Sequence, residues 1–508
     1  MKKILALTLA IVVLLSLGTF SVAETTSSST NEELWSKVDT SDPVVISMYV
    51  IATQPVAMQE VLDQVNLKLQ AKINTTLELN FISLSDFSTK YPLLLAGGDD
   101  VDLVYTSSWA YYKQQVDKGA FYELSEDFLS QYMPVTYQDL PAVAWQQISV
   151  NGKIYAVPRS DASLYGLRGV MVRDDIMEKY GFETVSSFAD YVELLKAIDA
   201  GNEQKDSGMY AFYISPARTL RVYVQQDNNW NLLSDNMYWD ADEGTSEDSV
   251  FFLYTQDAYK DYCLQTAELA QAGVWPANAV TGTTGTDELF LESKSATKVA
   301  NYYNDDKVIK EMRSKGIECT FYNVFNDSYY NKPDFYSGDA MAITAFSKNP
   351  ERAALCLDVI KNDIEINTLL TGGIEGEHYI YNAEDNTHEA GPSAADYPWD
   401  SWSWGIRSSL SPKSANLEPC ILQAMEENEA ARMPDDMWPF YGFYFDNTDV
   451  AAEQAVISAL VTEYSFSFDC GVFGDQTEAK YEEFVEKLNA AGLDKFVAEY
   501  KKQALGLD

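Results

Sequence analysis

Aromatic and acidic side chains are the residues of this sequence best suited to recognising a ligand. Its 508 residues include 10 tryptophans, 33 tyrosines and 77 aspartates and glutamates, but only two histidines. Sugars present flat C–H faces and dense hydroxyls, so sugar sites combine aromatic rings with carboxylates, amides and arginine. Trp109 is a first candidate, because it follows the predicted strand 101–105 and ligands of parallel sheets bind beyond the carboxyl ends of strands. The composition favours a sugar ligand, although the same rings also fill hydrophobic cores.

The motifs of metal, nucleophilic and phosphate chemistry are absent from the sequence. His378 and His388 lie in no HExxH motif, and the five cysteines have no CxxC spacing, so we predict no metal site. Neither a GxSxG nor a GxxxxGK[ST] motif occurs. We therefore predict no catalytic residue, no cofactor and no enzyme activity. The cysteines, none closer than 37 positions to another, are expected as buried apolar side chains and leave room for one disulfide.

A secreted glycoside hydrolase is the main alternative from another functional class. Such an enzyme needs two carboxylates that face each other at about 5–5.5 Å for retention or about 6.5–9.5 Å for inversion. No pair stands out among the 77 acidic residues. The sequence therefore neither identifies nor excludes this chemistry, but turnover discriminates: an enzyme consumes its sugar, whereas a binding protein returns it intact.

Residues 1–23 predict that the protein is exported. Lys2 and Lys3 precede an apolar stretch at 4–17 and the small residues Ser21 and Ala23, which is the pattern of a secretory signal peptide. The stretch is shorter than the roughly 20 residues that span a bilayer. We expect a periplasmic or extracellular protein whose residues 24–40 form a flexible, Ser/Thr-rich leader. The net charge of −41 would repel nucleic acid and anionic lipid, so neither is an expected partner.

The apolar pattern predicts an α/β architecture with two or three lobes, because a chain of this length exceeds what one core supports. β-branched or alternating runs predict strands at 44–49, 77–81, 101–105, 170–172 and 340–343. Apolar residues three and four positions apart predict helices at 58–73 and 188–198, and Gly181 and Gly492 are predicted helix ends. Because the strands at 44–49, 77–81 and 101–105 alternate with helices, they are expected to form a parallel sheet.

Several stretches, taken in their order, resemble the extracellular solute-binding proteins of carbohydrate ABC importers, in the LipO-like branch with a C-terminal extension. The resemblance runs over about residues 44–503 and rests on Leu94–Gly98, Asn151–Pro158, Val172–Asp175, Asn349–Ala354, Gly373–Tyr379, Gly442–Asp446 and Leu488–Gly492. One feature departs from that branch. No lipobox cysteine follows Leu17 and Gly18, so a lipid anchor is not predicted.

The resemblance implies a two-lobed periplasmic-binding-protein type II fold, with a ligand cleft between lobes that are joined by hinge strands. Lobe 1 would comprise residues 41–155 and 345–400, and lobe 2 residues 156–344 and 401–508 with a C-terminal helical extension. The implied function is to capture an oligosaccharide and present it, as a monomer, to the permease subunits of an ABC importer. Peptides and other small solutes are alternative ligands, and a sensor receptor in the membrane is an alternative partner.

The resemblance also implies which residues, besides Trp109, bind the ligand. One group follows the first crossing between lobes, a second lies where similar proteins place a stacking aromatic residue, and a third flanks a return crossing. In this order the groups are Tyr165 with Arg168, Asn301 with Tyr302, and Trp402 with Trp404. Asp161 and Glu375 would accept hydrogen bonds from sugar hydroxyls. Each of these residues also has an alternative role, in a core or on the solvated surface.

Overall fold

The computed structural model describes residues 31–507, apart from gaps at 99–100, 161–167, 202, 204–206, 216–217, 282–285, 326–328, 333–335, 401, 403, 407, 409, 435–436, 441–442 and 444. Contacts between residues divide the chain into two units. Unit 1 comprises Met1–Ala162 and Phe335–Asn416, and unit 2 comprises Ser163–Asp334 and Leu417–Asp508. The predicted signal peptide, residues 1–23, lies outside the described residues.

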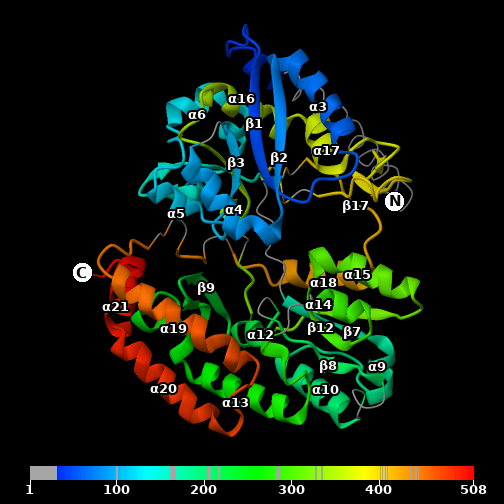
Figure 1. The fold of residues 1–508 in the computed structure, drawn as a ribbon, viewed down its shortest axis with the longest axis vertical. Coiled ribbons are helices and arrows are strands. Elements are labelled where there is room, and N and C mark those ends of the chain that lie inside the picture. Colours follow the sequence, from blue (N-terminus) through cyan, green and yellow to red (C-terminus); the bar gives the residue numbers. More distant parts are fainter. Residues whose placement is uncertain are drawn as a thin grey trace, which may run out of the picture. The chain divides into compact units, whose positions relative to one another are not determined.

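A five-stranded sheet forms the centre of unit 1 (Figure 1). β1 (Val44–Ile51) lies between β2 (Thr75–Ile82) and β3 (Leu103–Thr106) and is parallel to both, as the alternation of strands and helices predicts. β14 (Ala340–Ile343) pairs antiparallel with β3 on one side and with β6 (Val157–Pro158) on the other. β14 runs against β3 because the chain re-enters unit 1 beside the carboxyl end of that strand.

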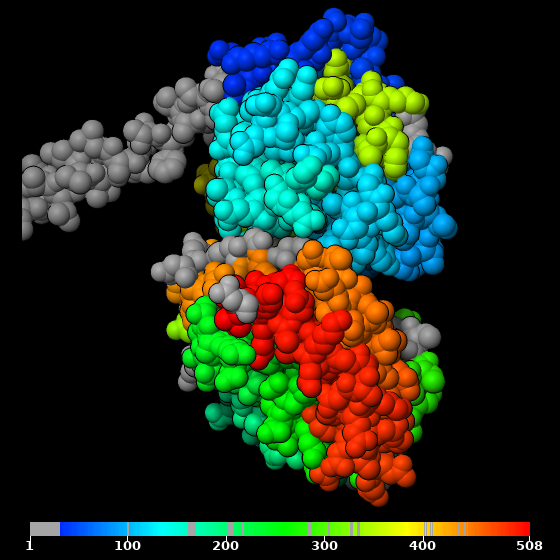
Figure 2. All heavy atoms as spheres, turned by 90° about the vertical axis from the view of Figure 1, so that its left-hand side faces the viewer, coloured from blue at the N-terminus to red at the C-terminus, as the bar shows by residue number. Residues whose placement is uncertain are grey.

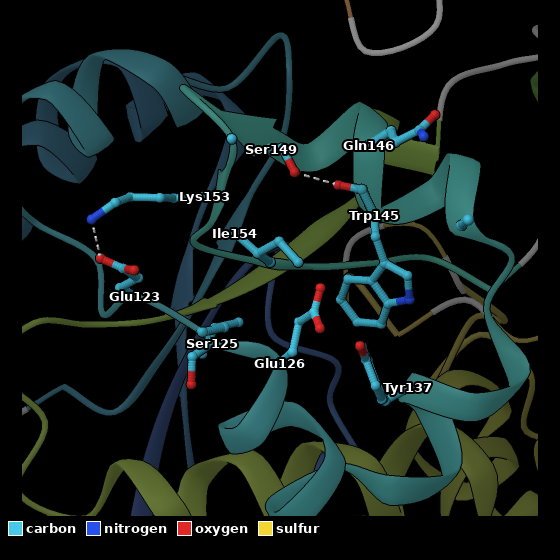
Figure 3. Close-up of a pocket in the computed structure, with 12 residues that line it drawn as sticks. Glu123, Ser125, Glu126, Tyr137, Trp145, Gln146, Ser149, Lys153 and Ile154 are labelled. Atoms are coloured by element: carbon cyan, nitrogen blue, oxygen red, sulfur yellow. Dashed lines mark hydrogen bonds and ion pairs between the residues drawn. The ribbon is translucent and has the colours of Figure 1, made fainter.

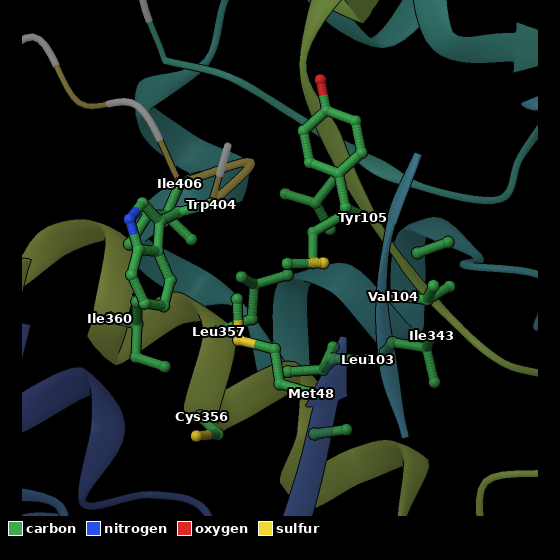
Figure 4. Packing of buried hydrophobic residues seen from close by; sticks show 14 of the residues in the cluster. Met48, Leu103, Val104, Tyr105, Ile343, Cys356, Leu357, Ile360, Trp404 and Ile406 are labelled. Atoms are coloured by element: carbon green, nitrogen blue, oxygen red, sulfur yellow. The ribbon is translucent and has the colours of Figure 1, made fainter. Parts of the chain in front are cut away.

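Helices pack on this sheet and complete the core of unit 1. α3 (Met58–Ile73) buries the predicted apolar stripe, namely Met58, Val61, Val65, Leu69 and Ile73. α16 (Pro350–Asn362) contributes Cys356, Leu357 and Ile360, which pack with strand residues such as Met48 and Leu103 (Figure 4). Further helices of unit 1 are α4 (Leu84–Gly97), α5 (Tyr112–Asp117), α6 (Glu126–Tyr132), α7 (Pro134–Asp139), α8 (Ala142–Ile148) and α17 (Ile364–Gly372).

Unit 1 also carries a small sheet in which a histidine lies on a tryptophan. Its strands are β15 (Tyr379–Asn382), β16 (Thr387–Ala390) and β17 (Lys413–Ser414). The ring of His388 stacks on that of Trp399, with centroids 3.6 Å apart and planes inclined by 11°. Burial lowers the pKa of His388 to about 4, because the charged imidazolium loses hydration there.

We expect this histidine to make the protein less stable as the pH falls. The unfolded chain takes up the proton near the ordinary pKa of 6.5, whereas the folded chain takes it up only near 4. Stability from this group is therefore complete above pH 6.5 and is lost between about pH 6.5 and 4. Because the ring is partly exposed, we expect a loss of about 1–2 kcal/mol. Urea unfolding at pH 6.5 and at pH 4 measures this loss of stability, and His388→Phe should reduce the loss. An equal loss in the variant would show that His388 is not its cause.

The described strands of unit 2 form two sheets. In the larger, ordered β13-β7-β12-β8, the strand β12 (Ser295–Asn301) is antiparallel to β7 (Arg168–Arg173) and parallel to β8 (Tyr210–Phe212). β13 (Cys319–Tyr322) pairs antiparallel with β7. The smaller sheet is antiparallel and consists of β9 (Trp230–Ser234), β10 (Met237–Asp240) and β11 (Val250–Phe252).

Two sequence predictions concern the helices of unit 2 that precede its C-terminal region, and both agree with the structure. α10 (Phe188–Ala200) covers the predicted helix 188–198, and α9 (Asp174–Tyr180) ends at Gly181, whose φ is +75°. The others are α12 (Arg221–Asp227), α13 (Asp257–Ala272), α14 (Thr286–Leu291), α15 (Tyr302–Ser314) and α18 (Pro419–Ala430).

Three C-terminal helices complete unit 2: α19 (Ala451–Asp469), α20 (Thr477–Ala490) and α21 (Leu493–Leu505). Figure 2 shows them, orange to red, as one continuous face of this unit. They pack on one another, and α19 and α20 also pack on α13. Two hydrogen bonds fix the end of α19: Thr266 Oγ1 donates to Phe468 O at 2.8 Å, and Trp275 Nε1 donates to Cys470 O at 3.0 Å. The extension is thus an integral part of unit 2.

The unit boundaries differ from the predicted lobe boundaries. Residues 156–162, 335–344 and 401–416 were assigned to lobe 2 by the resemblance but lie in unit 1. The reason is pairing and packing: β6 and β14 are hydrogen-bonded into the sheet of unit 1, and Trp404 is buried in its core.

The predicted leader is also corrected, from residue 31 onward. Residues 31–35 are helical, and Trp35 is 4% exposed. Its indole Nε1 donates to Asp358 Oδ2 of α16 at 2.9 Å, which satisfies a buried N–H. All five cysteines are free and four of them are buried, so the structure contains no disulfide among them. In the part of the chain that the structure describes, we find no helix with the length and apolar character of a membrane span.

Candidate functional site

Two tryptophan rings of unit 1, Trp109 and Trp402, lie side by side and form what we call the tryptophan platform. Trp109 follows β3, and Trp402 comes from the segment between β16 and β17. Their ring centroids are 6.4 Å apart and their planes are inclined by 52°. Trp109 is 52% exposed, so much of its ring surface is accessible.

Further aromatic rings hold this platform from within unit 1. The buried ring of Tyr105 lies 6.0 Å from that of Trp109 and 6.4 Å from that of Trp402. Phe87 of α4 lies 6.1 Å from Trp109. The indole Nε1 of Trp109 donates to Gly338 O at 3.0 Å. The edge of Trp109 is therefore fixed by a hydrogen bond while much of its ring surface stays exposed, which suits stacking against the C–H face of a sugar.

Hydrogen bonds between side chains and the backbone hold these two segments in place. After β3, Ser107 Oγ donates to Gly338 O at 2.6 Å, which ties the start of the Trp109 loop to the segment before β14. Before Trp402, the carboxylate of Asp400 accepts from the backbone N–H of Trp402 at 3.1 Å. Such a side-chain-to-backbone bond two residues on is the usual way in which an aspartate sets a turn.

Gly405 provides the close approach that the second segment needs. Its φ is +63°, and a Cβ there would lie 2.8 Å from Ala340 O of β14. We expect Gly405→Ala to lower the free energy of unfolding by about 1–3 kcal/mol, because the residue would be both strained and crowded. The variant should also weaken ligand binding, since Trp402 is only three residues away.

Gly376→Ala is the matched control for Gly405→Ala. Gly376 also has a positive φ, +82°, but no atom lies within 4 Å of a Cβ built there. Urea unfolding of both variants separates backbone strain from the clash with β14. Equal losses of stability, with equal ligand affinity, would show that the contact with Ala340 does not matter.

The structure gives the other predicted residues different settings. Trp404 is 2% exposed and packs edge-on against Phe81 at 6.0 Å, so it belongs to the core of unit 1 and is not available for stacking. Tyr302 is also 2% exposed and lies 6.4 Å from Phe321 in a hydrophobic cluster of unit 2. In both cases the neighbouring β-strands bury the ring, which corrects the expectation that it stacks on a ligand.

The predicted polar residues are not brought together by the contacts that the structure describes. Asn301 is half-buried at the end of β12, where its backbone N–H donates to Asp305. Glu375 is exposed in the turn after α17, and its backbone forms an isolated β-bridge with that of Tyr379. Asp161, Tyr165 and the side chain of Arg168 lie outside the described residues. Their roles as ligand contacts stay predictions.

Three residues at the platform were not predicted from the sequence. Tyr105, Arg159 and Asp339 are buried beside it, and Tyr105 OH donates to Asp339 Oδ1 at 3.1 Å. One signal in the sequence could have found Asp339: an acidic residue directly before the strongly apolar strand 340–343. A buried charge of this kind needs a partner, and Asp339 pairs with Arg159.

Comparison with known proteins bears on the fold and on the class of protein. A carbohydrate ABC transporter substrate-binding protein of Streptococcus pneumoniae serotype 4 is 22% identical over 483 residues, which cover 92% of this chain and 91% of that protein. The crystal structure of the N-glycan transport solute binding protein NgtS from Streptococcus pneumoniae matches with a TM-score of 0.73 at 18% identity, covering 92% of this chain and 99% of NgtS. The predicted resemblance to carbohydrate solute-binding proteins is confirmed. The predicted two-lobed fold is confirmed as well.

Two further similarities concern a second relative and the C-terminal region. The polygalacturonan/rhamnogalacturonan-binding protein YtcQ of Bacillus subtilis is 20% identical over 406 residues, which cover 76% of each chain. A family model described as a domain of unknown function (DUF3502) matches residues 439–505. This range contains α19, α20 and α21, the helices that are packed into unit 2.

Unit 1 also has a hollow of about 350 Å³, which is lined by residues other than those of the platform (Figure 3). Trp145 and Tyr137 form one side of it, with centroids 5.6 Å apart, and the ion pair of Lys153 with Glu123 at 2.7 Å forms the other. Part of its wall comes from α8, which packs on Tyr336–Gly338 and on β6. It shares no lining residue with the platform and has no part in the function proposed below.

Proposed function

We propose that this protein is the exported solute-binding component of a carbohydrate ABC importer and that it binds an uncharged oligosaccharide. The observation that carries the proposal is the tryptophan platform of unit 1, with an exposed ring of Trp109 inclined to that of Trp402. The names of the relatives support a carbohydrate ligand but not its lack of charge, because YtcQ is named for polygalacturonan, which is a polyuronate. NgtS has also been solved in complex with Man5GlcNAc, with a TM-score of 0.67 to this chain at 18% identity.

The chemistry of the described platform favours a neutral sugar over a uronate. Its members are aromatic, and the guanidinium beside it, that of Arg159, is 1% exposed and paired with Asp339. The net charge of −41 adds a field that repels anions. Neutral glycans gain from ring stacking without a charged partner, whereas uronates need cationic groups to offset the loss of hydration.

The role in transport follows from the fold class. Two-lobed binding proteins exchange between open and closed forms, and a ligand favours the form in which it makes more contacts. We propose that the ligand-bound form, as a monomer, is recognised by the permease subunits and that the sugar is released unaltered. The relatives are named as binding proteins rather than enzymes, which is consistent with this role.

A thermal-melting screen of the purified mature protein tests the proposal. The panel pairs uncharged mannose-containing oligosaccharides with oligogalacturonides of equal length, and adds peptides. A ligand at a hundred times its dissociation constant should stabilise the fold by about 2.7 kcal/mol. We expect the uncharged sugars to raise the melting temperature and to be recovered intact by mass spectrometry. Cleavage of the sugar would contradict the transport role and indicate a hydrolase. A response to uronates or peptides alone would contradict an uncharged oligosaccharide as the ligand.

A further inference from the structure

Two buried charged residues of unit 1 lie beside the points where the chain leaves and re-enters that unit. The chain leaves unit 1 after Ala162, three residues beyond Arg159. It re-enters unit 1 at residue 335, four residues before Asp339. Arg159 is 1% exposed and Asp339 is 5% exposed. Burying two charges is costly unless they are paired and hydrogen-bonded, so their contacts bear on what this position does.

The carboxylate of Asp339 is held on both of its oxygens. Oδ2 pairs with Arg159 Nη1 at 3.3 Å, and Oδ1 accepts from Tyr105 OH at 3.1 Å. The backbone adds a third link, since Arg159 N donates to Asp339 O at 3.1 Å. Asp339 thus connects both crossing segments to β3, the strand that leads to Trp109.

The same residue is joined to both rings of the platform through its neighbours. The carbonyl of Gly338, one residue earlier, accepts from Trp109 Nε1 at 3.0 Å. The ring of Tyr105, whose hydroxyl bonds to Asp339, lies within 6.4 Å of both Trp109 and Trp402. A shift of Asp339 would therefore move the acceptor of one indole and the ring that supports both.

We propose that Asp339 is a positioning residue for ligand binding: it holds Tyr105 and Gly338 so that Trp109 and Trp402 keep the mutual orientation that accepts a sugar ring. Arg159 supplies the opposite charge that allows the carboxylate to be buried, and it ties this arrangement to the first crossing segment. The ligand in this statement rests on the proposed function, but the positioning of the tryptophans does not.

Fluorine NMR of the mature protein labelled with 5-fluorotryptophan tests the positioning without any sugar. Trp109→Phe and Trp402→Phe assign the two platform resonances. Tyr105→Phe keeps the ring and removes the hydroxyl, so we expect those two resonances to shift or broaden while the other tryptophans stay unchanged. The matched control is Tyr112→Phe, which removes another buried tyrosine hydroxyl of unit 1, bonded to Ile148 O at 2.6 Å. The control should leave the platform resonances in place.

Affinity measurements on the same proteins complete the test. Tyr105→Phe and Asp339→Asn should each weaken sugar binding by about tenfold or more, the effect of one lost hydrogen bond to a charged group. The double variant should be little worse than Asp339→Asn alone, because Tyr105→Phe changes only a contact that Asp339→Asn already weakens. Unchanged platform resonances in Tyr105→Phe, or equal changes in Tyr112→Phe, would overturn the inference. If the wild-type protein binds no sugar, the proposed function fails while the NMR result still decides the positioning.

Discussion

Replacing Trp109 with alanine is expected to weaken oligosaccharide binding by about 30-fold or more, which corresponds to about 2 kcal/mol or more for a central aromatic contact. The ring is 52% exposed and is oriented by a hydrogen bond to Gly338 O, so its surface is available and its conformation is already fixed. A pre-oriented ring loses little conformational entropy on binding, which increases its contribution to affinity. Isothermal titration calorimetry of the variant and the wild-type protein measures the change directly.

The stability of the protein should hardly change in this variant, because a half-exposed ring contributes little to the core. Trp399→Ala is the matched control: Trp399 is also a partly exposed tryptophan of unit 1, but it stacks on His388 and not on the platform. We expect this control to bind sugar as the wild type does. Equal affinity of Trp109→Ala and wild type would remove the platform from the binding site.

The elements that the sequence predicts well are those in which burial repeats at short intervals. The apolar residues from Met58 to Ile73 are spaced as one buried helix face, and the β-branched run from Val44 is typical of a buried strand. Both α3 and β1 were therefore predicted nearly to the residue. The direction of β14 was not predictable in the same way. A strand of four buried residues reads alike in either direction, and only its hydrogen bonds to β3 and β6 fix it.

The candidate site shows the same limit. Trp109 follows from a rule about strand ends, whereas Trp402 and Trp404 are two residues apart and could not be told apart by pattern. The turn at Gly405 and the packing of Phe81 decide that one ring adjoins Trp109 and the other is buried. Contacts such as that of Tyr105 with Asp339, 234 positions apart, leave no local pattern at all.

Replacing Asp469 with alanine should cause the largest loss of stability, about 3–5 kcal/mol, because it breaks a buried ion pair on one side only. Asp469 is 1% exposed at the end of α19; its carboxylate pairs with Arg221 of α12 at 3.3 Å and accepts from Tyr262 OH of α13 at 2.8 Å. Alanine would leave the guanidinium of Arg221 without this charge partner and the tyrosine hydroxyl without this acceptor. Since these contacts join the C-terminal helices to the rest of unit 2, the loss should appear in the unfolding of that unit.

Differential scanning calorimetry can resolve this effect where the two units unfold in separate transitions. Glu478→Ala is the matched control, because Glu478 of α20 also bonds to α13, through Lys260 at 2.8 Å, but at an exposed position where an ion pair contributes about 0–1 kcal/mol. A large loss for Asp469→Ala beside a small one for Glu478→Ala would mean that the C-terminal helices are held through their buried charge. If the two variants lost the same small amount, apolar packing of α19 to α21 would have to hold the extension instead, and the charge of Asp469 would contribute nothing to it.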